Sequence, residues 1–444
     1  MTLKITEAVS HLAALAGKQA DAFDIVGGSS SSEGVSVFQG RLQNTEVSES
    51  VGVGIRIFKN GKPGYAHTER LTPEALALTL KDALSHTEFT EELPISLPKP
   101  ATLPPLKELY NPELDHVSLE TMKDFCIEAE KLAFESSPEV ENIPYLGADK
   151  GKSLFIIANS EGVFYENRTN HIAVGLGAVA ARGGDKKIGY YQQAGLDFSK
   201  FSASLLGGKA VEHATELLGA GPVPGGNLPV VFSERVAGSL VSMFSSSFLA
   251  SAVQKGFSRL EGKLGKSIAA SGFSLTDDPF REDLPGSQAF DSEGTLSQKI
   301  ELVRDGVLTD YLYNLESALR AGAESNGCAV RSYSGKVETA FSNLIVAPGE
   351  LPTSELLKLF PRCLFVVKLE GNSGCSAVSG EISIGAQGFL YENGNAVQAA
   401  EGFTLSTNFF DLLQNLVAVG SEYNEFFSSV KVPALAVSEI AVSS

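Results

Sequence analysis

Histidine is absent from the second half of this 444-residue chain. The six histidines are His11, His67, His86, His116, His171 and His213. Zinc sites and catalytic triads commonly use an imidazole. A zinc site or a catalytic triad in the second half would therefore need a histidine from the first half or from another chain.

Cysteine is scarce as well. The four thiols, Cys126, Cys328, Cys363 and Cys375, have no paired spacing typical of a zinc ribbon or a redox motif. We expect them to be reduced, as in a cytoplasmic protein. Cys126 lies beside an apolar helical stripe and is expected to be buried and inert.

Basic residues are too few and too scattered to form a nucleic-acid surface. The chain has 35 lysines and arginines against 53 acidic residues, its formal net charge is −18, and its longest basic run is Lys186-Lys187. Phosphate binding needs clustered basic side chains, so we expect no direct nucleic-acid contact. No apolar run approaches the ~18–20 residues that span a bilayer, and the N-terminus lacks a signal-peptide pattern, so we expect no membrane partner.

The length allows two domains with full cores, and 43% apolar with 20% charged residues is ordinary for a folded protein. The clearest linker is the glycine- and proline-rich stretch 219–227. We therefore predict an α+β protein with an N-terminal domain at 1–219 and a C-terminal domain at 220–444.

Helices and an antiparallel sheet are predicted for the N-terminal domain. Helical spacing occurs at 3–16, 72–86, 118–132 and 203–218. Asn60-Gly61 predicts a tight hairpin turn, and the prolines between residues 93 and 113 predict an extended strap. The run 27–34 is rich in glycine and serine but lacks the Gly-Lys-Ser/Thr end of a phosphate loop, so we interpret it as a flexible connection.

The C-terminal domain has many hairpin signals, such as Asn393-Gly394, and few helices. This pattern predicts a curled, barrel-like antiparallel sheet. The acidic segment 273–288 is expected to be a solvated loop. Asp291 and Glu293 could form an acid/base pair, but a turn between strands uses residues of this kind anyway.

One amphipathic helix organises the C-terminal domain. Ser233 and Glu234 suit the positive start of a helix. Apolar residues at helical spacing predict a buried face, at Ala237, Leu240, Val241, Phe244 and Phe248. The opposite face is predicted to carry Ser239, Ser242, Ser245, Ser246 and Ser247. So many hydroxyls are unusual here because serine competes with the helical backbone for hydrogen bonds.

The stretches VAGSLVSMFSSSFL, at 236–249, and KGFSRLEGKLG, at 255–265, resemble the TldD/PmbA family of peptidases, long labelled modulators of DNA gyrase. The chain is most similar to the TldE (PmbA) branch. In TldD-type chains this helix carries a zinc-binding His-Glu-x-x-x-His motif, whose positions correspond to Ser242, Met243 and Ser247 here. A serine hydroxyl is a poor zinc ligand, and a thioether cannot transfer the catalytic proton.

The resemblance covers nearly the whole chain and implies the same fold. It places a third zinc ligand, a cysteine, near the C-terminus of TldD-type chains, whereas the corresponding stretch 420–429 here has none. It therefore implies no catalytic residue, cofactor or metal site in this chain. Zinc is expected in a TldD-type partner, and the two subunits together would form a peptidase that trims unfolded peptides. The sequence leaves open whether the chain forms a homodimer when the partner is absent, although the resemblance favours dimers.

The glycine-rich run 371–380 has two open interpretations. Gly371, Gly374 and Gly380 could allow close approach of a peptide or of the partner's backbone. They could equally belong to a set of tight turns.

Two other functions are compatible with the sequence. One is an independent hydrolase with Cys375 or Ser376 as nucleophile and His171 or His213 as base, although the Gly-x-Ser-x-Gly frame of a nucleophile elbow is missing. The other is a non-proteolytic protein that binds gyrase or an antitoxin.

Overall fold

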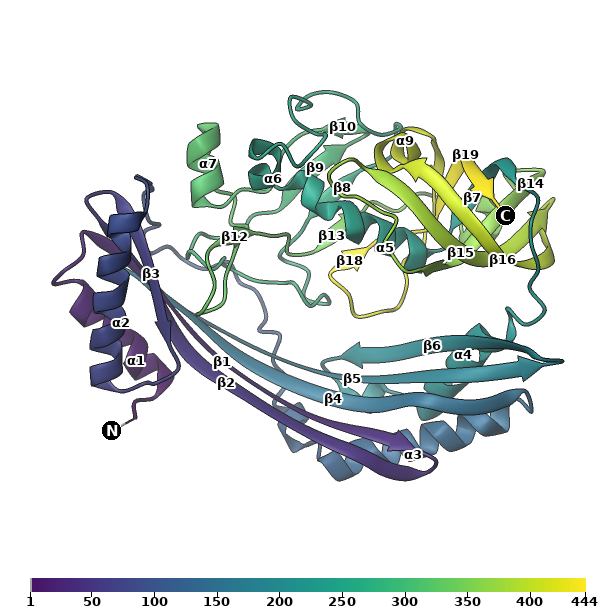
Figure 1. Ribbon diagram of the computed structural model, residues 1–444, viewed down its shortest axis with the longest axis horizontal. Helices are drawn as coiled ribbons and strands as arrows, with labels where there is room; N and C mark the ends of the chain where they lie inside the picture. Colours follow the sequence, from purple (N-terminus) through teal and green to yellow (C-terminus); the bar gives the residue numbers. More distant parts are fainter. Residues whose placement is uncertain (1) are drawn as a thin grey trace.

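The computed structural model describes residues 2–444. The N-terminal part is built on one antiparallel sheet of six strands, in the order β3-β2-β1-β4-β5-β6, which curves beneath the C-terminal part in Figure 1. The strands are β1 (Ala22–Phe38), β2 (Arg41–Lys59), β3 (Lys62–Thr68), β4 (Val140–Asn159), β5 (Phe164–Arg182) and β6 (Asp185–Gly195). Asn60 and Gly61 close the β2–β3 hairpin with positive φ angles of 52° and 74°, as the Asn-Gly signal predicts.

The prediction of a flexible connection at 27–34 is wrong. This glycine- and serine-rich run lies inside β1, where Ser30 pairs with Ser50 of β2 on one side and Ser153 of β4 on the other. Hydrogen bonds to two long neighbouring strands outweigh the weak strand preference of these residues. The absent side chain of Gly27 also lets a helix approach, since a Cβ there would lie 2.7 Å from Val9.

Four helices cover the outer side of this sheet and start where the sequence signals place them (Figure 1). They are α1 (Ile5–Ala16), α2 (Pro73–His86), α3 (Leu119–Ser136) and α4 (Ala203–Thr215), with short 3₁₀ helices η1 (Thr87–Phe89), η2 (Pro112–His116) and η3 (Phe198–Lys200). Thr72 caps α2 by accepting the Ala75 N–H, and Ser118 caps α3 by accepting the Thr121 N–H. The proline-rich strap before η2 is irregular, as predicted.

Two adjacent glycines in α4 give a matched test of how closely α3 and α4 pack. A Cβ on Gly207 would lie 2.8 Å from the carbonyl oxygen of Ala129 in α3, whereas a Cβ on Gly208 would meet no atom within 4 Å. We expect Gly208→Ala to raise the free energy of unfolding by about 0.5–1 kcal/mol, because alanine is the better helix former.

Gly207→Ala is expected to lower the same free energy by about 1–3 kcal/mol, because the backbones must separate. Urea unfolding followed by circular dichroism measures both variants. Equal effects of the two substitutions would contradict the packing described.

The C-terminal part is a closed barrel joined to a smaller sheet, as the curled-sheet prediction required. The barrel order is β16-β15-β14-β7-β19, and β16 pairs with β19 to close it. Its strands are β7 (Gly226–Phe232), β14 (Arg362–Glu370), β15 (Glu381–Glu392), β16 (Asn395–Asn408) and β19 (Leu435–Ser443), with β17 (Leu416–Val419) added beside β19.

The smaller sheet has the order β10-β9-β8-β13-β18 and shares one large apolar core with the barrel. Its strands are β8 (Leu275–Asp277), β9 (Ile300–Arg304), β10 (Val307–Leu308), β13 (Leu344–Val346) and β18 (Val430–Lys431), and a separate pair is β11 (Ala329–Val330) with β12 (Glu338–Thr339). The helices are α5 (Glu234–Phe244), η4 (Ser245–Phe248), α6 (Ala250–Gln254), α7 (Leu315–Ala321), α8 (Thr353–Leu356) and α9 (Phe409–Gln414).

Barrel closure pairs β16 with β19, and the strands left at sheet edges in the C-terminal part, β10, β17 and β18, are short. The long strands that end a sheet are instead β3 and β6, in the N-terminal part.

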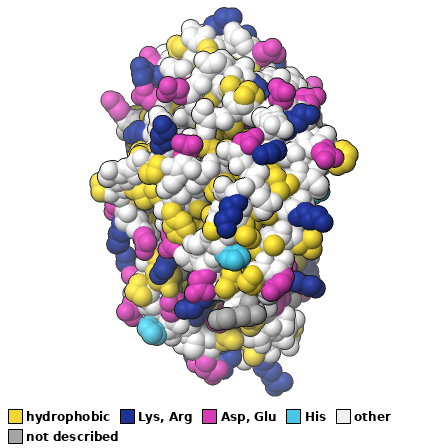
Figure 2. Space-filling view, turned by 90° about the vertical axis from the view of Figure 1, so that its left-hand side faces the viewer, with side chains coloured by type: hydrophobic (Ala, Val, Ile, Leu, Met, Phe, Trp, Pro, Cys, Tyr) yellow, Lys and Arg dark blue, Asp and Glu magenta, His cyan; other side chains and the backbone are white. Residues whose placement is uncertain are grey.

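Charges of both signs are mixed on the surface. On the face shown in Figure 2, lysine and arginine side chains lie singly or in small groups among acidic and apolar ones. No helix within residues 2–444 is long and apolar enough to cross a membrane.

Candidate functional site

Helix α5 lies at the lower side of the C-terminal part and faces the curved sheet in Figure 1. Ser233 caps it by accepting the Val236 N–H, as predicted. The apolar positions along the helix are buried, whereas Arg235, Ser239 and Ser242 form its exposed stripe.

The two positions that correspond to zinc-binding histidines have different surroundings. Helix α5 ends at Phe244, where φ is −101° and ψ is 6°, and the chain continues as the 3₁₀ helix η4. This change of winding turns Ser247 into the interior, where its side chain is fully buried and Oγ donates to the carbonyl oxygen of Ala377 at 3.3 Å. Ser242 stays exposed. The prediction that Ser247 shares the outer, serine-rich face is therefore wrong.

The donor set at these positions does not suit zinc. Ser242 and Ser247 offer hydroxyls, and Met243 offers only a thioether. Within residues 2–444 the structure holds no group of three or more His, Cys, Asp or Glu side chains that is placed to bind a metal ion.

The stretch 420–429 lies beside α5. A Cβ on Gly238 of α5 would be 3.9 Å from Nδ2 of Asn424. Lys431 holds this loop by donating from Nζ to the carbonyl oxygens of Asn424, at 3.0 Å, and Phe426, at 2.5 Å. The loop is thus brought to the helix without carrying a thiol.

The glycine-rich run 371–380 folds against η4, which follows α5, since its residue Ala377 accepts the hydrogen bond from Ser247. Contacts within the chain account for two of its glycines: a Cβ on Gly374 would lie 1.9 Å from the Ser383 carbonyl oxygen, and one on Gly380 would lie 2.7 Å from Asn408. Gly371 has a φ of 79°, and a Cβ there would meet no atom within 4 Å. Contact of these glycines with a peptide or partner stays a prediction.

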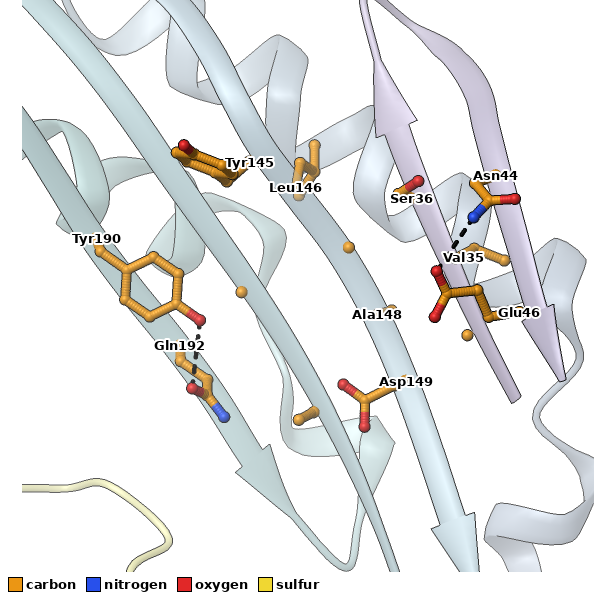
Figure 3. A pocket seen from close by; sticks show the side chains of 14 residues that line it. Val35, Ser36, Asn44, Glu46, Tyr145, Leu146, Ala148, Asp149, Tyr190 and Gln192 are labelled. Atoms are coloured by element: carbon orange, nitrogen blue, oxygen red, sulfur yellow. Dashed lines mark hydrogen bonds between the residues drawn. The ribbon is translucent and has the colours of Figure 1, made fainter. Parts of the chain in front are cut away.

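A groove runs along the inner face of the N-terminal sheet (Figure 3). Ser36, Gly147 and Gly175 stand side by side on β1, β4 and β5 and give it a floor of small residues. Tyr190 of β6 continues this groove and also lines two adjoining hollows, of 250 and 470 Å³, that lead to Arg235 of α5. We call this continuous surface the β6 groove.

A buried ionic cluster joins the N-terminal sheet to the C-terminal part. Arg56 of β2 donates from Nε to Asp24 of β1 at 2.8 Å and contacts Glu293 at 2.8 Å, and Arg331 contacts Asp24 at 2.5 Å. The Arg56–Glu293 and Arg331–Asp24 contacts are ion pairs, but their atoms are not oriented as hydrogen bonds. Asp24, Arg56 and Glu293 are at most 1% exposed. Nearby, a Cβ on Gly54 would lie 1.8 Å from the carbonyl oxygen of Tyr333.

The charges in this cluster stabilise one another. Burial opposes the ionisation of Asp24, but Arg331 and Arg56 outweigh it and hold the pKa of Asp24 below its usual range. Burial likewise opposes the charge of Arg56, yet Asp24 and Glu293 raise the pKa of Arg56 well above its ordinary value. Asp291 accepts backbone N–H groups and lies beside this cluster, where burial and the charge of Glu293 raise its pKa to about 7.

Asp291 and Glu293 are therefore enclosed at a domain junction, each less than 2% exposed, and not in an open acid/base site. Sequence reasoning missed Arg56, which pairs with Glu293, and Arg331, which pairs with Asp24. Arg56 carried a signal, because it is a charged residue inside the apolar strand 51–58.

The acidic segment 273–288 is also less solvated than predicted. Asp277 is 1% exposed, because β8 pairs with β13 and the Asp277 carboxyl accepts the N–H groups of Ser342 and Asn343. Burial raises the pKa of Asp277 to about 7, against the lowering effect of these two hydrogen bonds.

The folded-state pKa of Asp277 lies above its unfolded value near 4. The folded protein therefore holds this proton more tightly, and the stability that protonation provides is full below about pH 4 and is lost as the pH rises towards 7. Asp277→Asn keeps an acceptor oxygen but never ionises. We expect its stability relative to the wild type to increase by about 2–3 kcal/mol between pH 5 and pH 8.

Urea unfolding at several pH values measures this difference. Asp283→Asn is the control, because the Asp283 side chain is 63% exposed and pairs with Arg281, which lowers its pKa. Asp283 is ionised in both the folded and the unfolded state throughout this range. The stability of Asp283→Asn relative to the wild type should therefore not change with pH. A flat difference for Asp277→Asn would contradict the prediction.

The groups proposed for an independent hydrolase have other partners. Among residues 2–444, neither Cys375 nor Ser376 hydrogen-bonds to a histidine: His213 Nδ1 lies 3.0 Å from the Tyr190 carbonyl oxygen, and His171 Nε2 lies 3.8 Å from Asp149. Burial raises the pKa of the Cys375 thiol, which reduces its thiolate fraction.

Family models match almost the whole chain. They are described as PmbA/TldA metallopeptidase domain 1, over residues 23–86, the central domain, over 112–218, and the C-terminal domain, over 225–444.

Individual relatives agree with these matches. A metalloprotease of Methanothermobacter thermautotrophicus is 26% identical and covers 90% of this chain and 88% of its own length. Metalloprotease PmbA of Escherichia coli O157:H7 is 25% identical, and the match covers 94% of this chain and 91% of the relative's own length. A crystal structure from Thermotoga maritima, described as a candidate modulator of a DNA gyrase, has a TM-score of 0.91 at 26% identity over 99% of this chain and 100% of its own. TldE from Thermococcus kodakarensis shares the fold, with a TM-score of 0.88 at 21% identity. The match covers 98% of this chain and 100% of that structure's chain.

Proposed function

The chain belongs to the PmbA/TldD family of metallopeptidases, and from this premise we propose that it is a TldE-type subunit of a two-subunit peptidase. In this proposal the chain binds no zinc of its own. A TldD-type partner supplies the metal, and the assembled pair cleaves unfolded peptides in the cytoplasm.

One observation supports this proposal: the two segments that would form the metal site lie side by side, and their side chains are poor zinc ligands. Helix α5 and the loop 420–429 lie side by side, as a zinc site built from these two segments would need. The positions of the proposed ligands hold Ser242 and Ser247, the first exposed and the second buried, and the loop has no cysteine. A bound zinc would polarise the peptide carbonyl and activate water. None of these side chains can hold it.

The role left to this chain is to shape and hold the substrate. Helix α5 lies above the curved sheet (Figure 1), and its exposed residue Arg235 lines the same hollows as Tyr190 of β6. Tyr190 covers Gly175, but Ser36, Gly147 and Ala173 also line the β6 groove, and these small residues allow contact with a main chain without selecting particular side chains. Such a surface suits extended peptides of varied sequence and excludes folded domains. We infer that it forms this subunit's share of the peptide-binding chamber.

The Thermotoga maritima relative is described as a candidate modulator of a DNA gyrase. This proposal is compatible with such an effect only if it acts through other proteins and not through DNA binding. Direct DNA binding would oppose the net charge of −18. A peptidase that removes an unfolded regulator would act on such systems without touching DNA.

Mixing the purified chain with a TldD-type chain tests the proposed function. We expect a labelled unfolded peptide to be cleaved by the mixture and not by this chain alone, and we expect the two chains to elute together in size-exclusion chromatography. A mixture that neither co-elutes nor cleaves faster than the TldD-type chain alone would contradict it, and would favour a non-proteolytic binding protein.

A further inference from the structure

The β6 groove ends at two cations without acidic partners. Within residues 2–444, the guanidinium of Arg235 makes no hydrogen bond or ion pair, and the ammonium of Lys368 in β14 contacts only the carbonyl oxygen of Ile188, at 3.4 Å. Both residues line the 470 Å³ hollow of the groove. The surrounding protein partly desolvates both cations, although Arg235 is exposed, and this desolvation lowers the pKa of Arg235 and of Lys368. Glu370 opposes the lowering of the pKa at Lys368, and the charge of Arg235 adds to it.

The acidic residues of the same hollow do not satisfy these cations. Glu212 pairs with Lys209 at 2.8 Å, and Glu234 accepts the hydroxyl of Thr353 at 2.5 Å. Glu216 and Glu425 also line the hollow but form no ion pair within residues 2–444. Burial and the charge of Glu212 raise the pKa of Glu216 to about 7, so that Glu216 is partly neutral. Within residues 2–444, neither Arg235 nor Lys368 therefore makes a direct ion pair with the acidic side chains of this hollow.

The groove is closed just beyond these cations. Lys187 of β6 pairs with Glu401 of β16 at 3.0 Å, and this contact joins the C-terminal part to the edge of the N-terminal sheet. Two outward carbonyl oxygens of β6 are already in contact with side chains. Lys368 contacts the carbonyl oxygen of Ile188, and His213 contacts that of Tyr190. Because β6 is an edge strand, an added peptide strand can pair with it only beyond Tyr190, towards Gly195.

We propose that Arg235 and Lys368 bind the terminal carboxylate of an extended peptide that lies in the β6 groove. A carboxylate offers the acceptors that a guanidinium and an ammonium need, and its charge compensates theirs. The blocked end of β6 and the Lys187–Glu401 contact explain why a chain end, and not the middle of a chain, is bound there. This inference rests on the proposed peptidase role and adds which part of the substrate this subunit holds.

Binding of a short labelled peptide to the isolated full-length chain tests the inference without the partner. The peptide carries no acidic side chain and is prepared as the free acid and as the C-terminal amide. Fluorescence anisotropy should show the free acid binding about tenfold more tightly than the amide, as one charge-assisted contact allows. Arg235→Met and Lys368→Met should each remove most of this difference.

Lys209→Met is the matched control, because Lys209 lines the same hollow but is already paired with Glu212. It should keep the preference for the free acid. A third peptide, an amide with an internal glutamate, should bind as weakly as the plain amide.

Equal binding of acid and amide, or a preference that survives Arg235→Met and Lys368→Met, would overturn the inference. Tight binding of the internal-glutamate peptide would overturn the assignment to a chain end. Each of these results is separate from the proposed function, because cleavage by the two-subunit mixture is measured independently and can succeed while the carboxylate preference is absent.

Discussion

Arg56→Met is expected to lower the free energy of unfolding by about 3–5 kcal/mol, because it leaves buried carboxylates without their partner. Arg56 contacts both Asp24 and Glu293, and all three side chains are at most 1% exposed. Methionine fills much of the volume but cannot compensate the charge of Glu293, which has no other ion pair within residues 2–444. In the variant, Glu293 would keep only the hydrogen bond that it accepts from the backbone N–H of Leu315.

Lys59→Met gives the control on the same strand. Lys59 pairs with Asp21 at 3.0 Å, but these side chains are 43% and 51% exposed. Exposed pairs contribute less than about 1 kcal/mol, so this variant should unfold close to the wild type. Urea unfolding compares the two. A loss of similar size in both variants would contradict the view that burial makes the Arg56 cluster strong.

The Arg56 cluster also bears on function, because its residues come from both parts of the chain. Asp24 and Arg56 belong to the sheet that forms the floor of the β6 groove, whereas Glu293 and Arg331 belong to the part that carries α5. Loss of the cluster is therefore expected to loosen the placement of α5 over the sheet.

Peptide cleavage is expected to require both chains, and this is the largest functional effect that the account predicts. Without zinc the isolated chain should show no cleavage above background, whereas metal catalysis in the mixture should be faster by several orders of magnitude. Replacing the first histidine of the partner's zinc motif with alanine should abolish cleavage.

Ser242→Ala in the present chain should leave the rate within about twofold, as expected for a surface substitution away from the chemistry. Peptide hydrolysis is measured with a quenched fluorescent substrate at a fixed ratio of the chains. A large loss caused by Ser242→Ala would contradict the claim that this position has no catalytic role.

Local signals predicted the elements that depend on neighbouring residues. Ser118 and Ser233 start helices as their capping chemistry requires, and Asn60-Gly61 and Asn393-Gly394 close hairpins with positive φ angles. The exposure of Ser242 could also be predicted, because helical spacing places it opposite the apolar face of α5.

Long-range contacts decided what the sequence did not predict. The run 27–34 becomes a strand only because β2 and β4 pair with it on both sides. Ser247 is buried because the helix tightens after Phe244 and the loop 371–380 covers it. The unpaired state of Arg235 and Lys368 follows from how the two parts of the chain meet, and no spacing in the sequence records it.

Zinc content tests the central claim most directly. The chain is purified alone and then as a complex with a TldD-type partner, and the metal is measured by elemental analysis against protein concentration. We expect no stoichiometric zinc in the isolated chain, and zinc in the complex in proportion to the partner. One tightly bound zinc ion per isolated chain would contradict it.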